Sequence, residues 1–291
     1  MGSLTKLAAV SLLGVFLFPG TLSRAEEQSA TAQPTAPPPK SLFAQSAVQI
    51  LGREFRDGGV SYLLFDARSA NLLSSRWDDP ASPIPLGSLV KPFTALAYAE
   101  THDFQYPTYV CKGEASGCWQ LRPHGKLDIV SAIAISCNSY FRNLAQNLRA
   151  EQLLRTTNRF ALESPDLNLA GPDLMGLGDR WLISPLRMAR AYLELDRRRD
   201  QPGVREILAG MALSAQHGTG AGVGRFLKHS DALVKTGTAL CTHRHSAPAD
   251  GFVVAMVPAD QPEILLMIRV HGAAGAKASV MAGRMLRRIE E

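Results

Sequence analysis

The sequence lacks a long basic run and carries little excess charge of either sign. Its 31 lysine and arginine residues face 26 aspartate and glutamate residues, which gives a formal net charge of +5. The cluster Arg197-Arg198-Arg199 is most simply the solvated end of a helix. A nucleic-acid-binding domain usually shows a basic patch or stripe, so we expect no nucleic-acid partner.

The sequence also has no apolar run long enough for a comfortable membrane span. Residues 7–22 are apolar but too few for a spanning helix, and Lys6 gives the segment before them a positive charge. Ser23-Arg24-Ala25 then offers small residues at the positions that a signal peptidase reads. No cysteine follows the stretch, so we expect no lipid anchor. We predict a secretory signal peptide over residues 1–25, with an uncleaved anchor that ties the protein to the membrane as the alternative. Both readings place the rest of the chain outside the cytoplasm, in the periplasm or its equivalent.

Cysteine is scarce, with four residues in a chain of 291. An exported compartment permits disulfides, and Cys111 and Cys118 flank a short glycine-containing loop, so we predict that these two are bonded to each other. A metal site is the alternative, because His102 and His124 lie near them in the sequence. We expect that Cys137 takes part in no structural bridge.

The composition of the whole chain is that of an ordinary globular protein, with 46% hydrophobic and 20% charged residues. Residues 26–40 are rich in Ala, Pro, Thr and Gln, which favours an extended tether over a packed core. The folded part is therefore placed at residues 41–291.

The periodicity of this part predicts strands near both of its ends and helices between them. The predicted helices cover residues 41–53, 88–100, 127–147 with an interruption near Ser136, 184–199, 203–215 and 276–289. The predicted strands cover residues 60–66, 72–77, 232–240, 251–258 and 263–271. This order implies a sheet built from the first and last segments, with the middle of the chain forming a separate helical lobe over about 101–180.

The chain is organised around the stretch Gly87-Ser88-Leu89-Val90-Lys91-Pro92-Phe93. A serine and a lysine three positions apart on a helix lie on one face, about one turn apart, so a neutral lysine amine can take the serine proton. Proline is tolerated in a first helical turn, and the preceding Ser82-Pro83-Ile84-Pro85 cannot be helical, so the helix must begin near Ser88. By itself the spacing is a weak signal, because Ser3-Leu4-Thr5-Lys6 shares it.

Two further motifs follow in chain order. Ser136-Cys137-Asn138 interrupts a predicted helical region, and Lys235-Thr236-Gly237-Thr238-Ala239 lies on a predicted strand. A glycine inside a strand indicates that another backbone approaches closely. Serine-x-x-lysine, serine-x-asparagine and lysine-threonine-glycine form the set used by active-site-serine β-lactamases and penicillin-binding proteins. The joint occurrence is a strong signal for this chemistry.

On these motifs the sequence resembles the transpeptidase domain of the penicillin-binding proteins, over about residues 41–288. Further stretches that carry the resemblance are Val60 to Arg76, Cys118-Trp119, His124-Gly125, Leu127-Asp128, Ile135 to Phe141, Gly176-Leu177-Gly178, Ile183 to Ala189, His217-Gly218-Thr219-Gly220 and Gly251-Phe252. The resemblance implies a two-lobed α+β fold of the β-lactamase/transpeptidase type, with an antiparallel sheet flanked by helices and an all-helical lobe. The large N-terminal pedestal of the long transpeptidases and a glycosyltransferase domain are missing, which argues against a place in the main wall-building complexes.

The resemblance implies that Ser88 attacks a D-alanyl-D-alanine stem peptide of peptidoglycan, or a β-lactam antibiotic, and forms an acyl-enzyme. Lys91 would act as the base and Ser136 would relay a proton to the leaving nitrogen. The backbone N–H groups of Ser88 and Thr238 would form the oxyanion hole. Asn138 would bind the substrate's amide, and the third motif would hold its carboxylate through Lys235, Thr236, Gly237 and Thr238. No metal and no cofactor is implied.

The favoured function is a D,D-transpeptidase, and D,D-carboxypeptidase and serine β-lactamase are the alternatives. Some β-lactamases activate the deacylating water with a glutamate, but Glu163 stands one position too early beside Pro165-Asp166-Leu167-Asn168. Another β-lactamase class has an apolar residue in place of Asn138. Both facts favour a peptidase or transpeptidase. A penicillin-binding sensor or scaffold with little turnover is an alternative of another class, and a catalytic cysteine is weaker than the serine.

Overall fold

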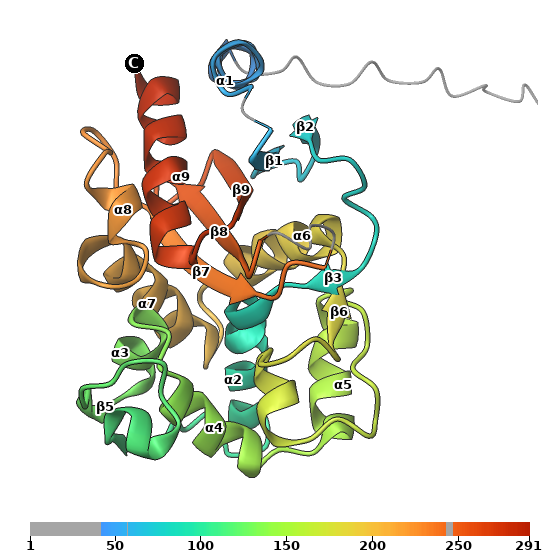
Figure 1. Cartoon of the computed structure of the whole chain (residues 1–291), viewed down its shortest axis with the longest axis vertical. Helices are drawn as coiled ribbons and strands as arrows, with labels where there is room; N and C mark the ends of the chain where they lie inside the picture. The colour runs from blue at the N-terminus through green and yellow to red at the C-terminus, as the bar shows by residue number, and fades with distance from the viewer. Residues whose placement is uncertain (1–41, 57, 243–246) are drawn as a thin grey trace, which may run out of the picture. The chain divides into compact units, whose positions relative to one another are not determined.

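Strands from the early and late parts of the chain form one five-stranded sheet, and helices fill the sequence between them (Figure 1). The computed structural model describes residues 42–56, 58–242 and 247–291. Its strands are β1 Val60–Asp66, β2 Leu72–Arg76, β3 Ile84–Pro85, β4 Tyr109–Cys111, β5 Gly125–Leu127, β6 Leu182–Ile183, β7 Leu233–Ala239, β8 Asp250–Val257 and β9 Ile264–His271. Its α-helices are α1 Leu42–Glu54, α2 Lys91–Ala99, α3 Ile129–Ala134, α4 Asn138–Gln146, α5 Ala150–Arg159, α6 Pro185–Arg197, α7 Val204–His217, α8 Ala221–Gly224 and α9 Gly275–Glu290, and its 3-10 helices are η1 Gly87–Val90, η2 Gly113–Ser116 and η3 Gly171–Met175. The predicted signal peptide (1–25) and tether (26–40) lie outside the described residues.

The sheet has the strand order β2-β1-β9-β8-β7, and every neighbouring pair is antiparallel. Its first two strands come from the start of the described chain and the other three from its end. The predicted α+β class, with an antiparallel sheet flanked by helices, is therefore confirmed. Strand β7 pairs with β8 along one edge. Its other edge pairs with no strand among the described residues and faces the helical part of the fold.

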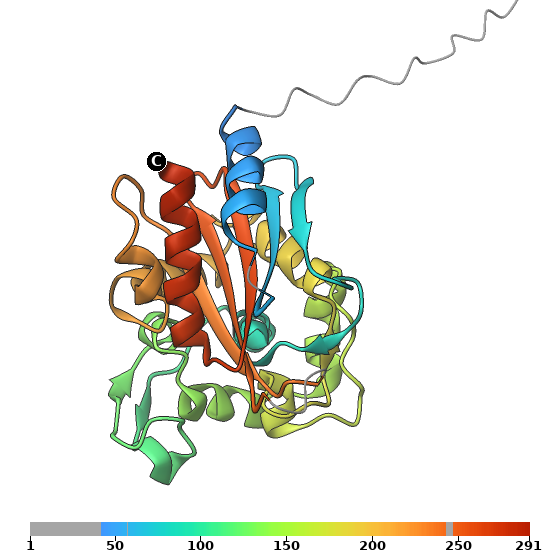
Figure 2. The same cartoon turned by 45° about the horizontal axis from the view of Figure 1, so that its top comes forward.

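The two faces of the sheet are covered by different helices, because side chains alternate along each strand. In β8, Val253 and Ala255 pack on the side of α1 and α9, whereas Val254 and Met256 pack into the core formed with α2 and the helices around it. Figure 2 shows α1 and α9 lying side by side across one face, and Arg288 of α9 joins Glu54 of α1 by an ion pair of 2.8 Å. Helix α2 and the helices around it therefore pack on the face opposite α1 and α9, whereas Ala215 of α7 and Val223 of α8 pack with α1 and α9 on the first face.

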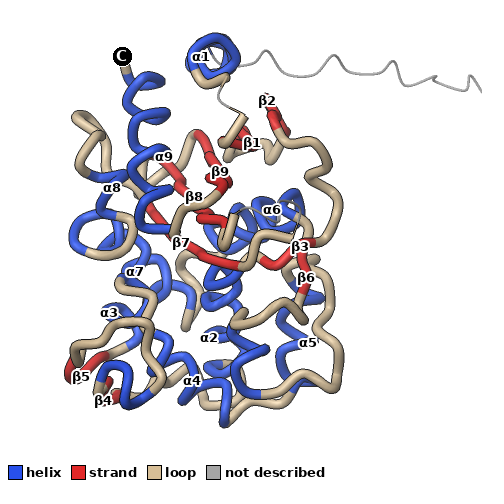
Figure 3. The backbone as a smooth tube through the Cα atoms, in the orientation of Figure 1, coloured by secondary structure: helices blue, strands red, loops and turns tan. Residues whose placement is uncertain are grey.

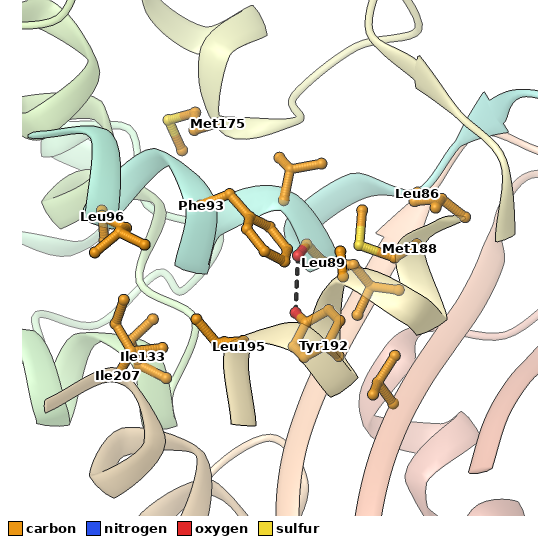
Figure 4. Close-up of a cluster of buried hydrophobic side chains, with 14 of the residues drawn as sticks. Leu86, Leu89, Phe93, Leu96, Ile133, Met175, Met188, Tyr192, Leu195 and Ile207 are labelled. Atoms are coloured by element: carbon orange, nitrogen blue, oxygen red, sulfur yellow. Dashed lines mark hydrogen bonds between the residues drawn. The ribbon is translucent and has the colours of Figure 1, made fainter. Parts of the chain in front are cut away.

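Helix α2 runs through the middle of this second core, and every residue from Lys91 to Ala99 is buried. Figure 4 shows Leu86, Leu89 and Phe93 packed among side chains of α6, including Met188 and Tyr192. The Tyr192 hydroxyl donates a hydrogen bond of 2.8 Å to the carbonyl oxygen of Leu89 (Figure 4). The turn that carries Ser88 is thus held in place by apolar packing against α6 and by one buried hydrogen bond.

Most predicted elements are present, and the differences are local. The helix expected to begin at Ser88 begins as the 3-10 turn η1 and continues as α2, with Pro92 in the first turn of α2. Helix α6 begins as predicted, with Ser184 accepting a hydrogen bond of 3.1 Å from the backbone N–H of Arg187. The region 101–180 also contains the short antiparallel ribbon β4–β5, which the sequence analysis did not predict (Figure 3). Strands of three residues are too short to show an alternating pattern.

Candidate active site

The nucleophile candidate, Ser88, is the partly exposed residue in a turn whose other residues are buried. The backbone N–H of Lys91 donates to the carbonyl oxygen of Ser88, which closes the turn. Gly87 has φ of +57°, and a Cβ added there would lie 2.1 Å from the carbonyl oxygen of Thr238. Only glycine combines that conformation with that approach. The sequence before Ser88 therefore lets strand β7 lie directly against the nucleophile turn.

The side chain of Lys91 is completely buried and connects the first motif to the second. Its Nζ donates to the carbonyl oxygen of Ser136 at 2.8 Å and to Oδ1 of Asn138 at 2.6 Å. It also lies 5.1 Å from the centre of the Phe141 ring. Burial disfavours the charged form and lowers the pKa of Lys91 to about 7, although the nearby thiols of Cys137 and Cys118 oppose this shift. A large fraction of Lys91 is therefore neutral at physiological pH, as a general base requires.

Ser136 brings its hydroxyl between two lysines. Its Oγ lies 3.4 Å from Nζ of Lys91 and 3.0 Å from Nζ of Lys235. The residue sits in the link between α3 and α4 with φ of +52°, a left-handed conformation that costs a non-glycine residue about 1–2 kcal/mol. The strained backbone lies at the point where the three motifs meet, which is typical of a functional site.

Lys235, on β7, is also completely buried. Its Nζ donates to Ser136 and, at 2.7 Å, to the carbonyl oxygen of Thr236. Burial, and then the charge of Lys91, hold the pKa of Lys235 well below its usual range. Within the described residues, neither lysine forms an ion pair with a carboxylate. An amine that is protonated in this pair has no acidic partner among the described residues, so an anionic ligand would stabilise its charge.

The third motif lies on the edge strand β7, where its backbone touches the nucleophile turn. A Cβ on Gly237 would lie 2.5 Å from the carbonyl oxygen of Leu86, so glycine is required for this contact. The Thr236 hydroxyl donates to the hydroxyl of Thr219 at 2.6 Å, and the backbone N–H of Gly275, at the start of α9, donates to Oγ1 of Thr238 at 2.9 Å. Thr219 thus lies beside the third motif, and its only signal in the sequence is the glycine-threonine stretch at residues 217–220.

The motifs surround one cavity of about 160 Å³. Six of the predicted site residues line it, namely Ser88, Ser136, Asn138, Thr236, Gly237 and Thr238. The other two, Lys91 and Lys235, lie buried beneath it. The rest of the lining is Trp119, Leu177, Thr219, Ala274 and Ala276, and of these the sequence carries no functional signal for Ala274 or Ala276. A larger hollow of about 510 Å³ along α7 contains none of the motif residues, so the chemistry assigns the smaller cavity as the site.

Comparison with known proteins agrees with this geometry. Residues 74–291 match the penicillin binding protein transpeptidase domain. The chain belongs to this family. No curated protein sequence matches it.

Solved structures of transpeptidases share the fold. Pseudomonas aeruginosa PBP2 in complex with WCK 5153 superimposes with a TM-score of 0.66 at 16% identity, covering 85% of this chain and 73% of that one. The Helicobacter pylori PBP2 in a complex with MreC gives 0.69 at 17% identity, covering 85% of this chain and 62% of that one. The D,D-transpeptidase domain of a peptidoglycan glycosyltransferase from Eggerthella lenta gives 0.64 at 17% identity, covering 84% and 80%. At these identities the likeness shows the fold.

Glu163 does not reach the cavity of this transpeptidase domain. Its carboxylate pairs with Arg187 at 3.4 Å and its carbonyl oxygen accepts a hydrogen bond of 3.1 Å from the Trp181 ring nitrogen. It is absent from the residues that line the cavity. The structure therefore offers no role for Glu163 in activating a water at Ser88.

The predicted disulfide between Cys111 and Cys118 is wrong. No disulfide joins the four cysteines, all of which lie in the described part of the chain. Instead, Cys111 and Cys118 converge with His124 and Cys137 directly beneath the second motif of the transpeptidase site. Their nearness in the sequence suggested a pair, whereas the fold assembles a group of four. These are the residues that could hold a metal here.

Proposed function

We propose that this transpeptidase domain is a serine-type D,D-transpeptidase that acts on the D-Ala-D-Ala stem peptides of peptidoglycan through an acyl-enzyme on Ser88. The observation that carries the proposal is the position of the Ser136 hydroxyl, which two buried lysines contact from two different motifs at the floor of the cavity that Ser88 lines. Three motifs from distant parts of the chain thus meet at one reacting point.

In the first half-reaction, neutral Lys91 takes the proton of the Ser88 hydroxyl while the serine oxygen attacks the carbonyl carbon of the penultimate D-alanine. The oxyanion is stabilised by the backbone N–H groups of Ser88 and Thr238. The bond to the terminal D-alanine then breaks, and Ser136, between the two lysines, passes a proton to the leaving nitrogen. The products are free D-alanine and an ester on Ser88.

The second half-reaction transfers the acyl group to an acceptor. The amine of a second stem peptide attacks the ester, gives up a proton to the same relay and restores the Ser88 hydroxyl. With water as the acceptor, the same steps make a D,D-carboxypeptidase. A β-lactam enters as a substrate mimic and leaves the serine acylated.

Substrate binding follows from the charges and from the edge strand. Lys235, which forms no ion pair with a carboxylate in the described residues, would bind the terminal carboxylate of the stem peptide when its amine is protonated. Thr236 and Thr238 place hydroxyl groups beside it, and Asn138 offers an amide to the peptide backbone. The free edge of β7 supports binding of an extended peptide as an added strand.

Such a substrate lies outside the cytoplasmic membrane, so we place the protein in the periplasm or an equivalent extracytoplasmic space. In the described residues no helix is both long and apolar enough to cross a membrane. The predicted signal at residues 1–25 supports export.

The test is labelling with a fluorescent penicillin followed by mass spectrometry of the intact protein and of its peptides. We expect one adduct, on the peptide that contains Ser88, and none with Ser88→Ala. Ser82→Ala, an exposed serine on the same segment, is the matched control and should label normally. An undiminished adduct on Ser88→Ala would overturn the assignment. Stem peptide offered with and without an amine acceptor then separates transpeptidase from carboxypeptidase.

A further inference from the structure

Three cysteines and a histidine meet beneath the second motif. Cys111 ends β4, Cys118 follows η2, His124 precedes β5 and Cys137 stands at the start of α4. The four ligand-type atoms all lie within 4.8 Å of one another. Cys111 and Cys118 therefore lie close to Cys137, the middle residue of the second motif. Cys137 follows Cys118 by 19 positions in the sequence.

Three distances within this group match the edges of a metal tetrahedron. Zinc–sulfur bonds of about 2.3 Å and zinc–nitrogen bonds of about 2.0–2.1 Å give tetrahedral edges of about 3.8 Å between two sulfurs and about 3.6 Å between sulfur and nitrogen. The Cys118 and Cys137 sulfurs are 3.8 Å apart. Nδ1 of His124 lies 3.4 Å from the Cys111 sulfur and 3.5 Å from the Cys118 sulfur.

The surroundings suit bound thiolates. Cys111 and Cys137 are fully buried and Cys118 is 8% exposed. The backbone N–H of Gly113 donates to the Cys111 sulfur at 3.4 Å, and the Ser116 hydroxyl lies 4.0 Å from the same atom. Donors of this kind stabilise and orient ligands from the outer shell of a metal site.

The loop of the ribbon is linked to α4 by a hydrogen bond of 2.7 Å from the Ser139 hydroxyl to the Ser116 hydroxyl, and a metal would strengthen this link. Strands β4 and β5 have three residues each and pair only with one another. A two-stranded ribbon is marginal in water unless something else holds it. A metal bound by Cys111, Cys118 and His124 on one side and Cys137 on the other would fasten the ribbon to the start of α4.

We propose that Cys111, Cys118, His124 and Cys137 bind one zinc ion in a closed, four-coordinate site that positions the second motif. A set of three sulfurs and one nitrogen favours zinc among the common divalent metals, and four protein ligands leave no open position for chemistry. The zinc has a structural role. Its effect on the reaction, which rests on the proposed function, is to fix Cys137 and so the neighbours Ser136 and Asn138 that Lys91 contacts.

A second group, Cys241, Asp250 and His271, also brings ligand-type atoms within 4.8 Å of one another. It offers three side chains instead of four, and Nδ1 of His271 lies 3.0 Å from Asp250. Three side chains do not complete a four-coordinate site, and Cys241 provides a matched control for the other three cysteines.

The experiment measures zinc in the full chain, purified under reducing conditions without chelators, by elemental mass spectrometry. We expect about one zinc ion per chain in the wild type and in Cys241→Ser, and a loss of at least tenfold in Cys111→Ser and Cys118→Ser. His124→Cys, which keeps four ligands, should retain zinc. Cobalt(II) exchanged into the wild type should give a sulfur-to-cobalt charge-transfer band and the visible bands of a tetrahedral ion.

Two outcomes would overturn the proposal. One is wild-type protein with all its thiols reduced that holds no zinc and gives no tetrahedral cobalt spectrum. The other is zinc that stays in Cys111→Ser and leaves with Cys241→Ser. Zinc content is independent of activity, so these results stand even if Ser88 is not acylated. If Ser88 is acylated, removal of zinc should slow acylation by on the order of 10²-fold, the effect of a small misplacement of reacting groups. Added zinc should then restore the rate.

Discussion

Nζ of Lys91 lies 2.6 Å from Oδ1 of Asn138, although 47 positions separate the two residues. The contact joins the lysine of the first motif to the side-chain amide of the second motif. Asn138 has no negative charge, so it holds the lysine in place without favouring its protonated form as strongly as a carboxylate would. The activity should therefore report directly on the protonation of Lys91.

We expect acylation by penicillin to rise with pH through about pH 7. Burial lowers the pKa of Lys91 to about 7, and only the neutral amine can accept the proton of Ser88. Below this value each unit of pH should lower the rate constant about tenfold, and above it the rate should level off. Fluorescent penicillin over about pH 5 to 9 measures the profile, with the exposed Lys228→Ala as control. A flat or falling profile would contradict the role of Lys91.

Replacing Ser136 by alanine should slow acylation by about 10²–10⁴-fold, the usual range for losing a positioned proton-transfer group. The change removes the hydroxyl that lies 3.0 Å from Lys235 and 3.4 Å from Lys91. Ser131→Ala, on the neighbouring helix α3, should stay within a few fold of wild type. Stopped-flow labelling gives the rate, and thermal unfolding checks that the variant is folded. Equal rates for the two variants would remove Ser136 from the mechanism.

The acyl-enzyme formed with a β-lactam should be long-lived. Glu163 pairs with Arg187 and does not line the cavity, so it cannot activate a water against the ester. We expect release of a fluorescent penicillin to be slow compared with its binding, with close to one label per chain. Release within seconds, with many turnovers, would identify a serine β-lactamase.

Gly237→Ala should both destabilise the fold and prevent acylation. The added Cβ would lie 2.5 Å from the carbonyl oxygen of Leu86, so β7 must move away from the nucleophile turn, at a cost of about 1–3 kcal/mol for overpacking. Gly52→Ala is the matched control, because its Cβ meets nothing within 4 Å. It should stabilise helix α1 by about 0.5–1 kcal/mol. Denaturant unfolding and penicillin labelling compare the two, and a neutral Gly237→Ala would show that the close approach is not needed.

The sequence predicted the sheet and the motifs because each has a local signature. Strands β8 and β9 show long apolar runs, and Ser88 with Lys91 follows a proline-rich segment that cannot be helical. The ribbon β4–β5 has no such signature. The thiol group was misread for a related reason: Cys111 and Cys118 are close in sequence, whereas Cys137 reaches them only through tertiary packing. Likewise, no local pattern could show that Thr219 hydrogen-bonds to Thr236.

The position of β7 at the edge of the sheet determines when the candidate site can form during synthesis of the chain. The hydrogen bond from Lys235 to Ser136 spans 99 positions, and β7 is held by β8, which follows it and pairs in turn with β9. A growing chain in which α2 has left the ribosome but β8 and β9 have not therefore contains Ser88 without the cavity that β7 completes. Penicillin should therefore fail to label chains that lack β8 and β9, so the label can be used to time the completion of the sheet.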